Sequence, residues 1–519
     1  MSSASAEGEP RGHGLLWSEG GPAGFALFFA IIAVTMLDPW WTENEAYYLT
    51  LGEILITGGS FDSLSAMTPG SSARVPMAGL MGAVIEIFGD RLGLLVLRLL
   101  AITAYALSLA WLARTYRISN VMLAIALAVF LLMGQSYFAG AWMFGGVETK
   151  SFALACAIAG VAATLSGRLR WALILGAIGT YAHFLIGGFW FGAALLLAVL
   201  QGEKLMKVVR FGAFYALAVA PIVAALVYDT LVAPGGDLAA LGTTAGEIYA
   251  ERNSHHVAPF INNREIFRWL PGISLLGGFL IFFVGLLIFL PERVTAFERW
   301  LFLLNLYLAG CLLLAYLDRH TNYLSVLYIF RPNTLILLLS LAAATKVVLG
   351  AIGGREMRLL PLLLIVVVAA QAGPKLANAA YDYVTRPEAV LRIDGRLRAE
   401  ERLLFDWIAA ETPAGAVIML EPVRGREMVM PWAAFEQISG RLTLVNFKYS
   451  PANVGELPEW YRRRLWRRDV FAGNCHLLGA YPVTHLLTFK GRTLERVAAC
   501  GKVVYQRAGL GVVRLPDRQ

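Results

Sequence analysis

Apolar runs recur between residues 22 and 380 and are separated by short polar segments. A helix needs roughly 20 mostly apolar residues to cross a bilayer. Runs near that length lie at 22–37, 88–112, 120–138, 151–166, 211–232, 272–290, 300–317, 331–350 and 359–380. This pattern predicts a polytopic α-helical membrane domain over residues 22–380.

A longer apolar run, 171–200, is interrupted by the polar stretch Thr180-Tyr181-Ala182-His183 and has basic residues on both flanks. Because basic loops tend to stay in the cytoplasm, both ends of this run are expected on that side of the membrane. The run is therefore predicted to form a hairpin of two short helices, which brings the total to about 11 transmembrane helices.

The charge of the loops predicts an orientation. The short loops at 114–117, 168–170, 204–210, 292–299 and 355–358 are basic or mixed. We expect them in the cytoplasm, together with a disordered tail over residues 1–21 that is polar and rich in Ser and Gly. The segments expected outside are 38–87, 139–150, 233–271, 318–330 and 381–519. We therefore predict a multi-pass protein of the bacterial inner (plasma) membrane, with a cytoplasmic N-terminus and a periplasmic C-terminus.

Composition supports a membrane protein. Of the 519 residues, 58% are hydrophobic and only 15% are charged, whereas soluble proteins are closer to half apolar and a quarter charged. Most of the formal net charge of +8 falls within residues 381–519. This charge is expected to hold a soluble domain near anionic membrane lipids. Nucleic acid is not an expected partner, since no recognition motif accompanies the charge.

Residues 381–519 are predicted to form a separate, small α/β domain in the periplasm. Its expected elements are helices at 394–410 and 460–468 and strands at 416–420, 442–446, 483–489 and 502–507. Cys475 and Cys500 lie in this region, and they could form a disulfide if the domain is periplasmic.

An acidic and aromatic stretch follows the first apolar run directly. Residues 38–48 read Asp-Pro-Trp-Trp-Thr-Glu-Asn-Glu-Ala-Tyr-Tyr. Ionisable groups at the boundary of a membrane are costly and usually functional. This stretch therefore predicts an enzyme that acts at the membrane surface.

Part of this stretch, Asn44-Glu45-Ala46-Tyr47-Tyr48, resembles the Asp-Glu-Ala-Tyr-Tyr motif in the first outer loop of GT-C glycosyltransferases. That superfamily includes protein mannosyltransferases and aminoarabinose transferases. Asp406-Trp407-Ile408 with Thr412-Pro413 also looks like their C-terminal domains, and like a group of poorly characterised bacterial membrane proteins. The resemblance implies a GT-C-like membrane fold. It also implies transfer of a sugar from a polyprenyl-phosphate donor to a lipid, glycan or protein acceptor.

Asn44 stands where the GT-C motif has its leading Asp. An amide cannot accept a proton as a general base. Because the transfer needs a carboxylate to deprotonate the acceptor hydroxyl, the expected catalytic base is Glu45, Glu43 or Asp38. Cationic side chains are also needed beside the departing phosphate, to stabilise its negative charge.

Other polar residues near the predicted outer face are candidates for substrate binding. They are Arg74, Glu148, Lys150, His183, Arg264, Arg268, Arg319, His320 and Arg331. Simpler roles stay open: Arg74 could be an interfacial anchor, and His183 could be a hydrogen-bonded packing residue. Glu148 and Lys150 could form an interfacial cap with a snorkelling lysine. Arg331 could pair with Asp318, with an acid on another helix, or with a bound phosphate.

No cofactor is predicted, although dependence on a divalent metal is left open. The adjacent pair His255-His256 lies in segment 233–271, which we interpret as a mobile substrate-gating loop. Adjacent residues rarely ligate one ion well, so no metal site is assigned. Two other functions stay open: a transporter or flippase of lipid-linked glycans, and a non-catalytic partner in envelope polysaccharide assembly, which Asn44 favours.

Overall fold

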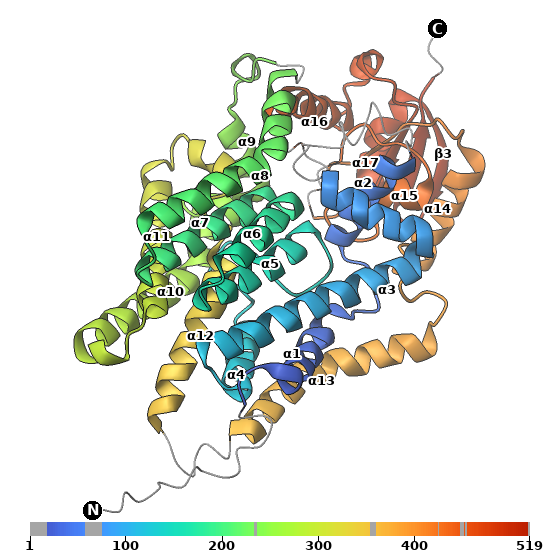
Figure 1. The fold of residues 1–519 in the computed structure, drawn as a ribbon. Helices are drawn as coiled ribbons and strands as arrows, with labels where there is room; N and C mark the ends of the chain where they lie inside the picture. Colours follow the sequence, from blue (N-terminus) through green and yellow to red (C-terminus); the bar gives the residue numbers. More distant parts are fainter. Residues whose placement is uncertain are drawn as a thin grey trace, which may run out of the picture.

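The computed structural model describes residues 18–57, 75–232, 236–352, 360–423, 425–446, 451 and 454–516. Long helices form most of the molecule, and a small sheet domain lies at one end of them (Figure 1). The described chain thus has a predominantly helical body followed by an α/β domain, as the pattern of apolar residues predicts.

The first part of the helical body ends with the predicted hairpin. Its helices are α1 (Gly21–Met36), α2 (Glu43–Thr57), α3 (Val75–Tyr116), α4 (Asn120–Leu132), α5 (Thr149–Leu165), α6 (Leu169–Ala182) and α7 (Phe184–Leu200). Only His183 separates α6 from α7, in an extended conformation. The two helices touch closely, since a Cβ atom on Gly187 would lie 2.1 Å from Thr180 N. The prediction of two short helices within 171–200 is confirmed.

The second part contains α8 (Leu205–Val232), α9 (Ala245–Val257), α10 (Asn263–Phe289), α11 (Ala296–Leu317), α12 (Asn333–Ile352) and α13 (Leu360–Thr385). All but α9 coincide with predicted apolar runs. Helix α9 lies within segment 233–271, so the described part of that segment holds a helix where a loop was expected.

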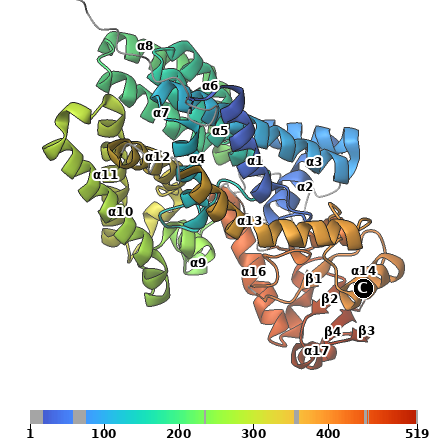
Figure 2. The same cartoon turned by 90° about the horizontal axis from the view of Figure 1, so that it is seen from below.

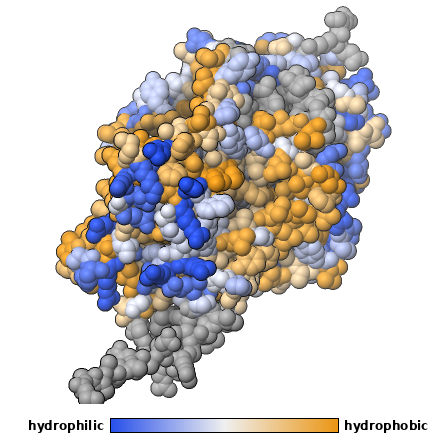
Figure 3. All heavy atoms as spheres, in the orientation of Figure 1, coloured by the Kyte–Doolittle hydropathy of each residue, from blue (hydrophilic) through white to orange (hydrophobic). Residues whose placement is uncertain are grey.

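Five described helices are long and apolar enough to cross a membrane: α3, α8, α10, α11 and α12. The shorter helices α1, α4, α5, α6 and α7 are also apolar. Large apolar side chains are exposed on several of these helices, among them Leu107, Leu217 and Ile281. Figure 3 shows a broad hydrophobic area on one face of the molecule. Exposed apolar surface of this extent is typical of contact with lipid.

The C-terminal domain contains a four-stranded sheet in the order β1-β2-β4-β3. Its strands are β1 (Ile418–Leu420), β2 (His485–Thr488), β3 (Lys502–Arg507) and β4 (Leu510–Arg514). Strands β1 and β2 are parallel, while the pairs β2–β4 and β3–β4 are antiparallel. Figure 2 shows the sheet at one corner of the molecule, with helices around it. These helices are α14 (Ala399–Glu411), α15 (Phe435–Ser439), α16 (Leu457–Phe471) and α17 (Gly491–Val497).

Two details of this domain differ from the sequence prediction. The prediction of a strand at 442–446 is wrong. In this segment the structure has one isolated β-bridge, between Val417 and Leu442. Strand β4 was not expected. It lies between β2 and β3, so it closes the antiparallel half of the sheet.

The segment before α2 is tied to the chain that leads into the C-terminal domain. Trp40 Nε1 donates to Asp382 Oδ2 at 3.0 Å, and Trp41 Nε1 donates to the Leu391 carbonyl at 2.8 Å. The Leu391 N–H in turn donates to the Pro39 carbonyl at 2.8 Å. These contacts fix the position of the C-terminal domain beside the start of α2.

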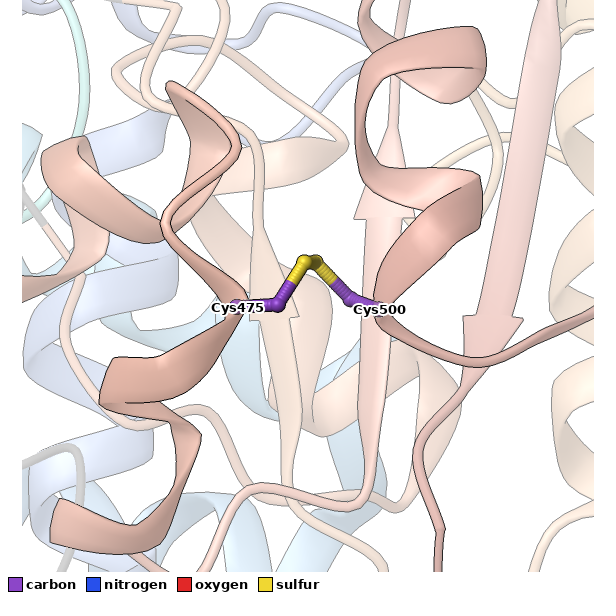
Figure 4. The surroundings of a disulfide bond; sticks show 2 residues. All are labelled: Cys475 and Cys500. Carbon is purple, nitrogen blue, oxygen red and sulfur yellow. A yellow bond between two sulfur atoms is a disulfide. The ribbon is translucent and has the colours of Figure 1, made fainter.

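Cys475 and Cys500 form a disulfide with Cα atoms 5.1 Å apart (Figure 4). The bond joins two short 3-10 helices, Cys475–Ala480 and Ala498–Cys500, and closes a sequence separation of 25 residues. The pairing that the sequence left open is therefore present. Cys156 and Cys311 are free.

Replacement of Cys475 by Ser is expected to destabilise the C-terminal domain by about 2 to 4 kcal/mol, because a cross-link of this span restricts the unfolded chain. Limited proteolysis and thermal unfolding of the full chain would show earlier cleavage after α13 and a lower Tm. The control is Cys156→Ser, which leaves the disulfide intact. Equal behaviour of the two variants would contradict a stabilising role for the bond.

Candidate functional site

The sequence predicted that the acidic stretch 38–48 lies in an outer loop. In the structure this stretch leads into a helix instead. Helix α2 begins at Glu43, so Glu43 and Glu45 both lie in its first turn, where the helix dipole favours negative charge. Asp38 lies before the helix and accepts a hydrogen bond from the Trp40 N–H at 2.8 Å. The carboxylates of this stretch therefore have three different environments.

Glu45 is fully buried and forms a two-point ion pair with Arg98 of α3. Arg98 Nε donates to Glu45 Oε1 at 2.8 Å, and Arg98 Nη2 donates to Glu45 Oε2 at 2.7 Å. The same guanidinium also donates to the carbonyls of Asp38 and Trp40. Arg98 thereby holds the chain before α2 against α3.

Two backbone N–H groups complete the contacts of the Glu45 carboxylate. Thr42 N donates to Oε2 and Val147 N donates to Oε1, each at 2.8 Å. Gly146 allows this close approach, because a Cβ atom there would lie 3.0 Å from Glu45 Cδ. A carboxylate surrounded by four donors suits a role in positioning the chain better than a role in accepting a substrate proton.

A cavity of about 510 Å³ lies beside the Glu45–Arg98 pair and is lined by both the helical body and the C-terminal domain. Its ionisable lining groups include Glu43, Glu148, Lys150, His183, Arg252, His255, His256 and Arg331. Met428 and Pro451 of the C-terminal domain close one side. The described structure thus brings five of the residues proposed from sequence into one cavity: Glu43, Glu148, Lys150, His183 and Arg331.

Other predicted residues lie elsewhere. Asp38 and Glu45 are not among the lining residues, and neither are Arg264, Arg268, Arg319 and His320. Arg264 and His320 are exposed. Arg268 is 4.0 Å from Glu265 at the surface, and the Arg319 guanidinium lies 4.2 Å from the centre of the Tyr316 ring. Arg74 lies outside the described residues.

Glu148 and Lys150 combine the two roles that the sequence left open. Glu148 is the N-cap residue of α5, and its Oε1 lies 2.6 Å from Lys150 Nζ. Lys150 Nζ also lies 3.8 Å from the centre of the Trp142 ring. The lysine and the glutamate therefore largely balance each other at the cavity wall.

Glu43 and Arg331 are the uncompensated charges of the cavity. Within the described parts of the chain, Glu43 makes no hydrogen bond or ion pair, although it is half-buried. Arg331 Nε is buried and has no hydrogen-bond partner in the same residues, and its guanidinium lies 4.7 Å from the centre of the Tyr328 ring. Asp318, the partner considered from sequence, instead accepts from Leu324 N at 2.7 Å.

Three histidines contribute to the wall. His183 occupies the break between α6 and α7, where its backbone N–H donates to the Gly179 carbonyl at 2.8 Å. The rings of His255 and His256 are 3.9 Å apart, and His256 Nδ1 is hydrogen-bonded to the Ala139 carbonyl. Burial, followed by the nearby charges of His255 and Arg331, lowers the pKa of His256 well below its usual value. Among the described residues, no three His, Cys, Asp or Glu side chains are grouped to hold a metal ion.

An apolar groove of about 940 Å³ runs along α3, α5 and α6. Its walls include Leu100, Leu107, Trp111 and Phe152. It extends to Tyr181 and Ala182, which directly precede His183 of the cavity. The groove and the polar cavity are thus lined by consecutive residues of the chain at the end of α6.

Two functional residues were missed from the sequence. Arg98 lies well inside the apolar run 88–112, and a charge in such a place is costly enough to have indicated a buried partner. Arg252 also lines the cavity, but nothing in its sequence context separates it from a surface arginine.

Comparison with known proteins is limited to the C-terminal domain. A family model described as a domain of unknown function (DUF6798) matches residues 399–466. This region extends from the start of α14 into α16. No curated protein matches the chain.

Replacement of Arg98 by Met should destabilise the protein by about 3 to 5 kcal/mol, since it leaves the Glu45 carboxylate buried without its cation. Adding Glu45→Gln should recover part of this loss, because the amide oxygen can still accept from Val147 N. Thermal unfolding of the single and double variants would measure the coupling. The exposed Arg114→Met serves as the control on the same helix. Additive losses would contradict the proposed ion pair.

Proposed function

We propose that the protein is a GT-C-type glycosyltransferase that moves a sugar from a polyprenyl-phosphate donor to a lipid, glycan or protein acceptor. The observation that supports this most is the cavity that holds an uncompensated carboxylate, Glu43, and an uncompensated guanidinium, Arg331. Such a pair suits a reaction that removes a proton at one point and stabilises a phosphate at another.

The proposed reaction is an inverting displacement. The acceptor oxygen attacks the anomeric carbon of the sugar, and the bond from that carbon to the phosphate oxygen breaks. The acceptor proton passes to the Glu43 carboxylate, and the lipid phosphate leaves with the bonding electrons. We favour Glu43 over Glu45 and Asp38 because it alone of the three lines the cavity.

The cationic side of the cavity fits the phosphate. Arg331 lines the cavity and can present its guanidinium to a phosphate oxygen, and Lys150 lies in the same wall. An arginine that is partly removed from water gains most from an anionic ligand, since the low local dielectric strengthens the attraction.

The groove along α3, α5 and α6 fits the hydrocarbon part of such a donor. Its walls are almost entirely apolar, and it reaches Tyr181 and Ala182, the last residues of α6 before the cavity residue His183. A lipid could therefore place its chain among the helices and its phosphate beside Arg331. Membrane lipids would fill the same groove in the absence of donor.

The proposed location is the outer face of a bacterial inner membrane, with the cavity on the periplasmic side. The disulfide between Cys475 and Cys500 supports an oxidising compartment for the C-terminal domain. The domain contributes to the cavity wall, so both would lie on the same side of the membrane.

Glu43→Gln should lower the rate of sugar transfer by roughly a hundredfold to ten-thousandfold, because the amide cannot accept the hydroxyl proton. Arg331→Met should lower it by about a hundredfold to a thousandfold through loss of charge on the phosphate. The measurement is transfer of labelled sugar from a panel of polyprenyl-phosphate donors in proteoliposomes.

The matched controls for this experiment are Glu292→Gln and Arg264→Met, which change exposed residues away from the cavity. Both should transfer at the rate of the unaltered protein. Full activity of Glu43→Gln would remove Glu43 as the base. No transfer by the unaltered protein with any donor would count against the transferase.

A second function is favoured by one residue. Asn44 lines the cavity beside Glu43, at the position where the GT-C motif has its Asp. A chain that has lost this base could serve as a non-catalytic partner in polysaccharide assembly. If so, the unaltered protein should show no transfer, and Asn44→Asp should gain it. Equal transfer by both would favour Glu43 as a sufficient base.

A further inference from the structure

His256 lies at the C-terminal end of α9 and forms part of the cavity wall. Its Nδ1 is hydrogen-bonded to the Ala139 carbonyl, which can only accept, so Nδ1 carries a hydrogen. In the neutral ring Nε2 is therefore an acceptor. No bond to Nε2 is formed by any described residue, so this nitrogen is left for a ligand.

The charges around His256 oppose its protonation. The His255 ring lies 3.9 Å from the His256 ring on the same helix, at a tilt of 42°, and Lys150 of α5 and Arg331 before α12 lie in the same wall. Burial and these groups lower its pKa well below the usual value. On the acidic side, Glu148 is balanced by Lys150 at 2.6 Å, which leaves Glu43 of α2 as the opposing charge among the described residues that line the cavity.

A phosphate in this cavity changes that balance. Phosphate oxygens are acceptors, and an acceptor nitrogen cannot bond to them unless one proton is added. A neutral imidazole can instead accept from a hydroxyl without any proton. The fixed tautomer therefore makes His256 sensitive to the kind of ligand present.

We propose that His256 takes up one proton at Nε2 when a phosphomonoester dianion occupies the cavity, and thereby stabilises the departing lipid phosphate. This inference rests on the proposed transferase function. It assigns His256 a role in binding the product that neither its sequence context nor the DUF6798 match provides.

In the proposed reaction the lipid phosphate gains one negative charge, and protonation of His256 would compensate for it. While the sugar is attached, the donor phosphate is a diester with one negative charge. When the bond to the anomeric carbon breaks, the phosphate keeps the electron pair and becomes a monoester with two negative charges. The acceptor proton goes to Glu43, and the proton on His256 Nε2 comes from water and then bonds to a phosphate oxygen.

Calorimetry can test this on the full-length protein in lipid nanodiscs. The probe is farnesyl phosphate, and the comparison ligand is its methyl diester, which carries a single charge. Titrations at pH 7.5 in two buffers of different ionisation enthalpy give the number of protons exchanged. At this pH the free monoester is mostly a dianion, since its second pKa is about 6.

The monoester should bind with uptake of up to one proton, and the diester should bind without uptake. Because a proton is bound together with the monoester, its affinity should fall as pH rises, by up to roughly tenfold per unit. In His256→Gln the uptake should vanish while binding persists. The exposed His320→Gln should behave like the unaltered protein.

Isotope-labelled histidine NMR on the unaltered protein provides a second readout that needs no variant. Farnesyl phosphate should shift one imidazole to its protonated form. Binding of the monoester without proton uptake, or uptake that survives in His256→Gln, would overturn this inference alone. Binding of neither probe would overturn it together with the transferase. Proton-linked binding without any sugar transfer would overturn the transferase and leave the phosphate site.

Discussion

The buried ion pair between Glu45 and Arg98 is the contact on which the cavity depends. Two charges inside a helical body are costly unless every donor and acceptor is satisfied. Here the carboxylate receives four hydrogen bonds, and the guanidinium also holds two carbonyls before α2. The pair therefore fixes α2, α3 and the chain before α5 relative to one another. The pair also sets the positions of Glu43 and Glu148, because each lies one or two residues from a residue that is bonded to the Glu45 carboxylate or carries it.

Contacts with the C-terminal domain also hold the cavity in shape. Trp40 and Trp41 resemble residues of an interfacial aromatic belt in the sequence, yet their indoles hydrogen-bond to Asp382 and Leu391. Farther along, Tyr249 of α9 donates to the Pro451 carbonyl at 3.1 Å. Helix α9, which carries His255 and His256, is thus held by the domain that closes the cavity. Both parts of the chain are needed to form it.

The sequence predicts the helices well because a run of apolar residues has few alternatives in a membrane protein. It also places the break at His183, where polar groups interrupt such a run. It fails where tertiary contacts decide. Glu43 and Glu45 are two residues apart, so on a helix they point about 200° apart, one to the cavity and one to Arg98. The sequence does not reveal that this segment is a helix, so it gives no basis for choosing between the two acids as the catalytic base. Strand β4 contains a glycine, which weakens its strand pattern.

The remaining charges of the cavity point to a ligand with two functional ends. Glu148 and Lys150 balance each other, whereas Glu43 and Arg331 share the cavity without forming an ion pair within the described chain. Opposite charges attract strongly where water is scarce, so a fold that keeps them separate forgoes a favourable contact. That loss is offset if a substrate lies between them, with a hydroxyl toward the carboxylate and a phosphate toward the guanidinium. The placement of Glu43 and Arg331 in one cavity, without an ion pair between them among the described residues, therefore fits the group transfer proposed above.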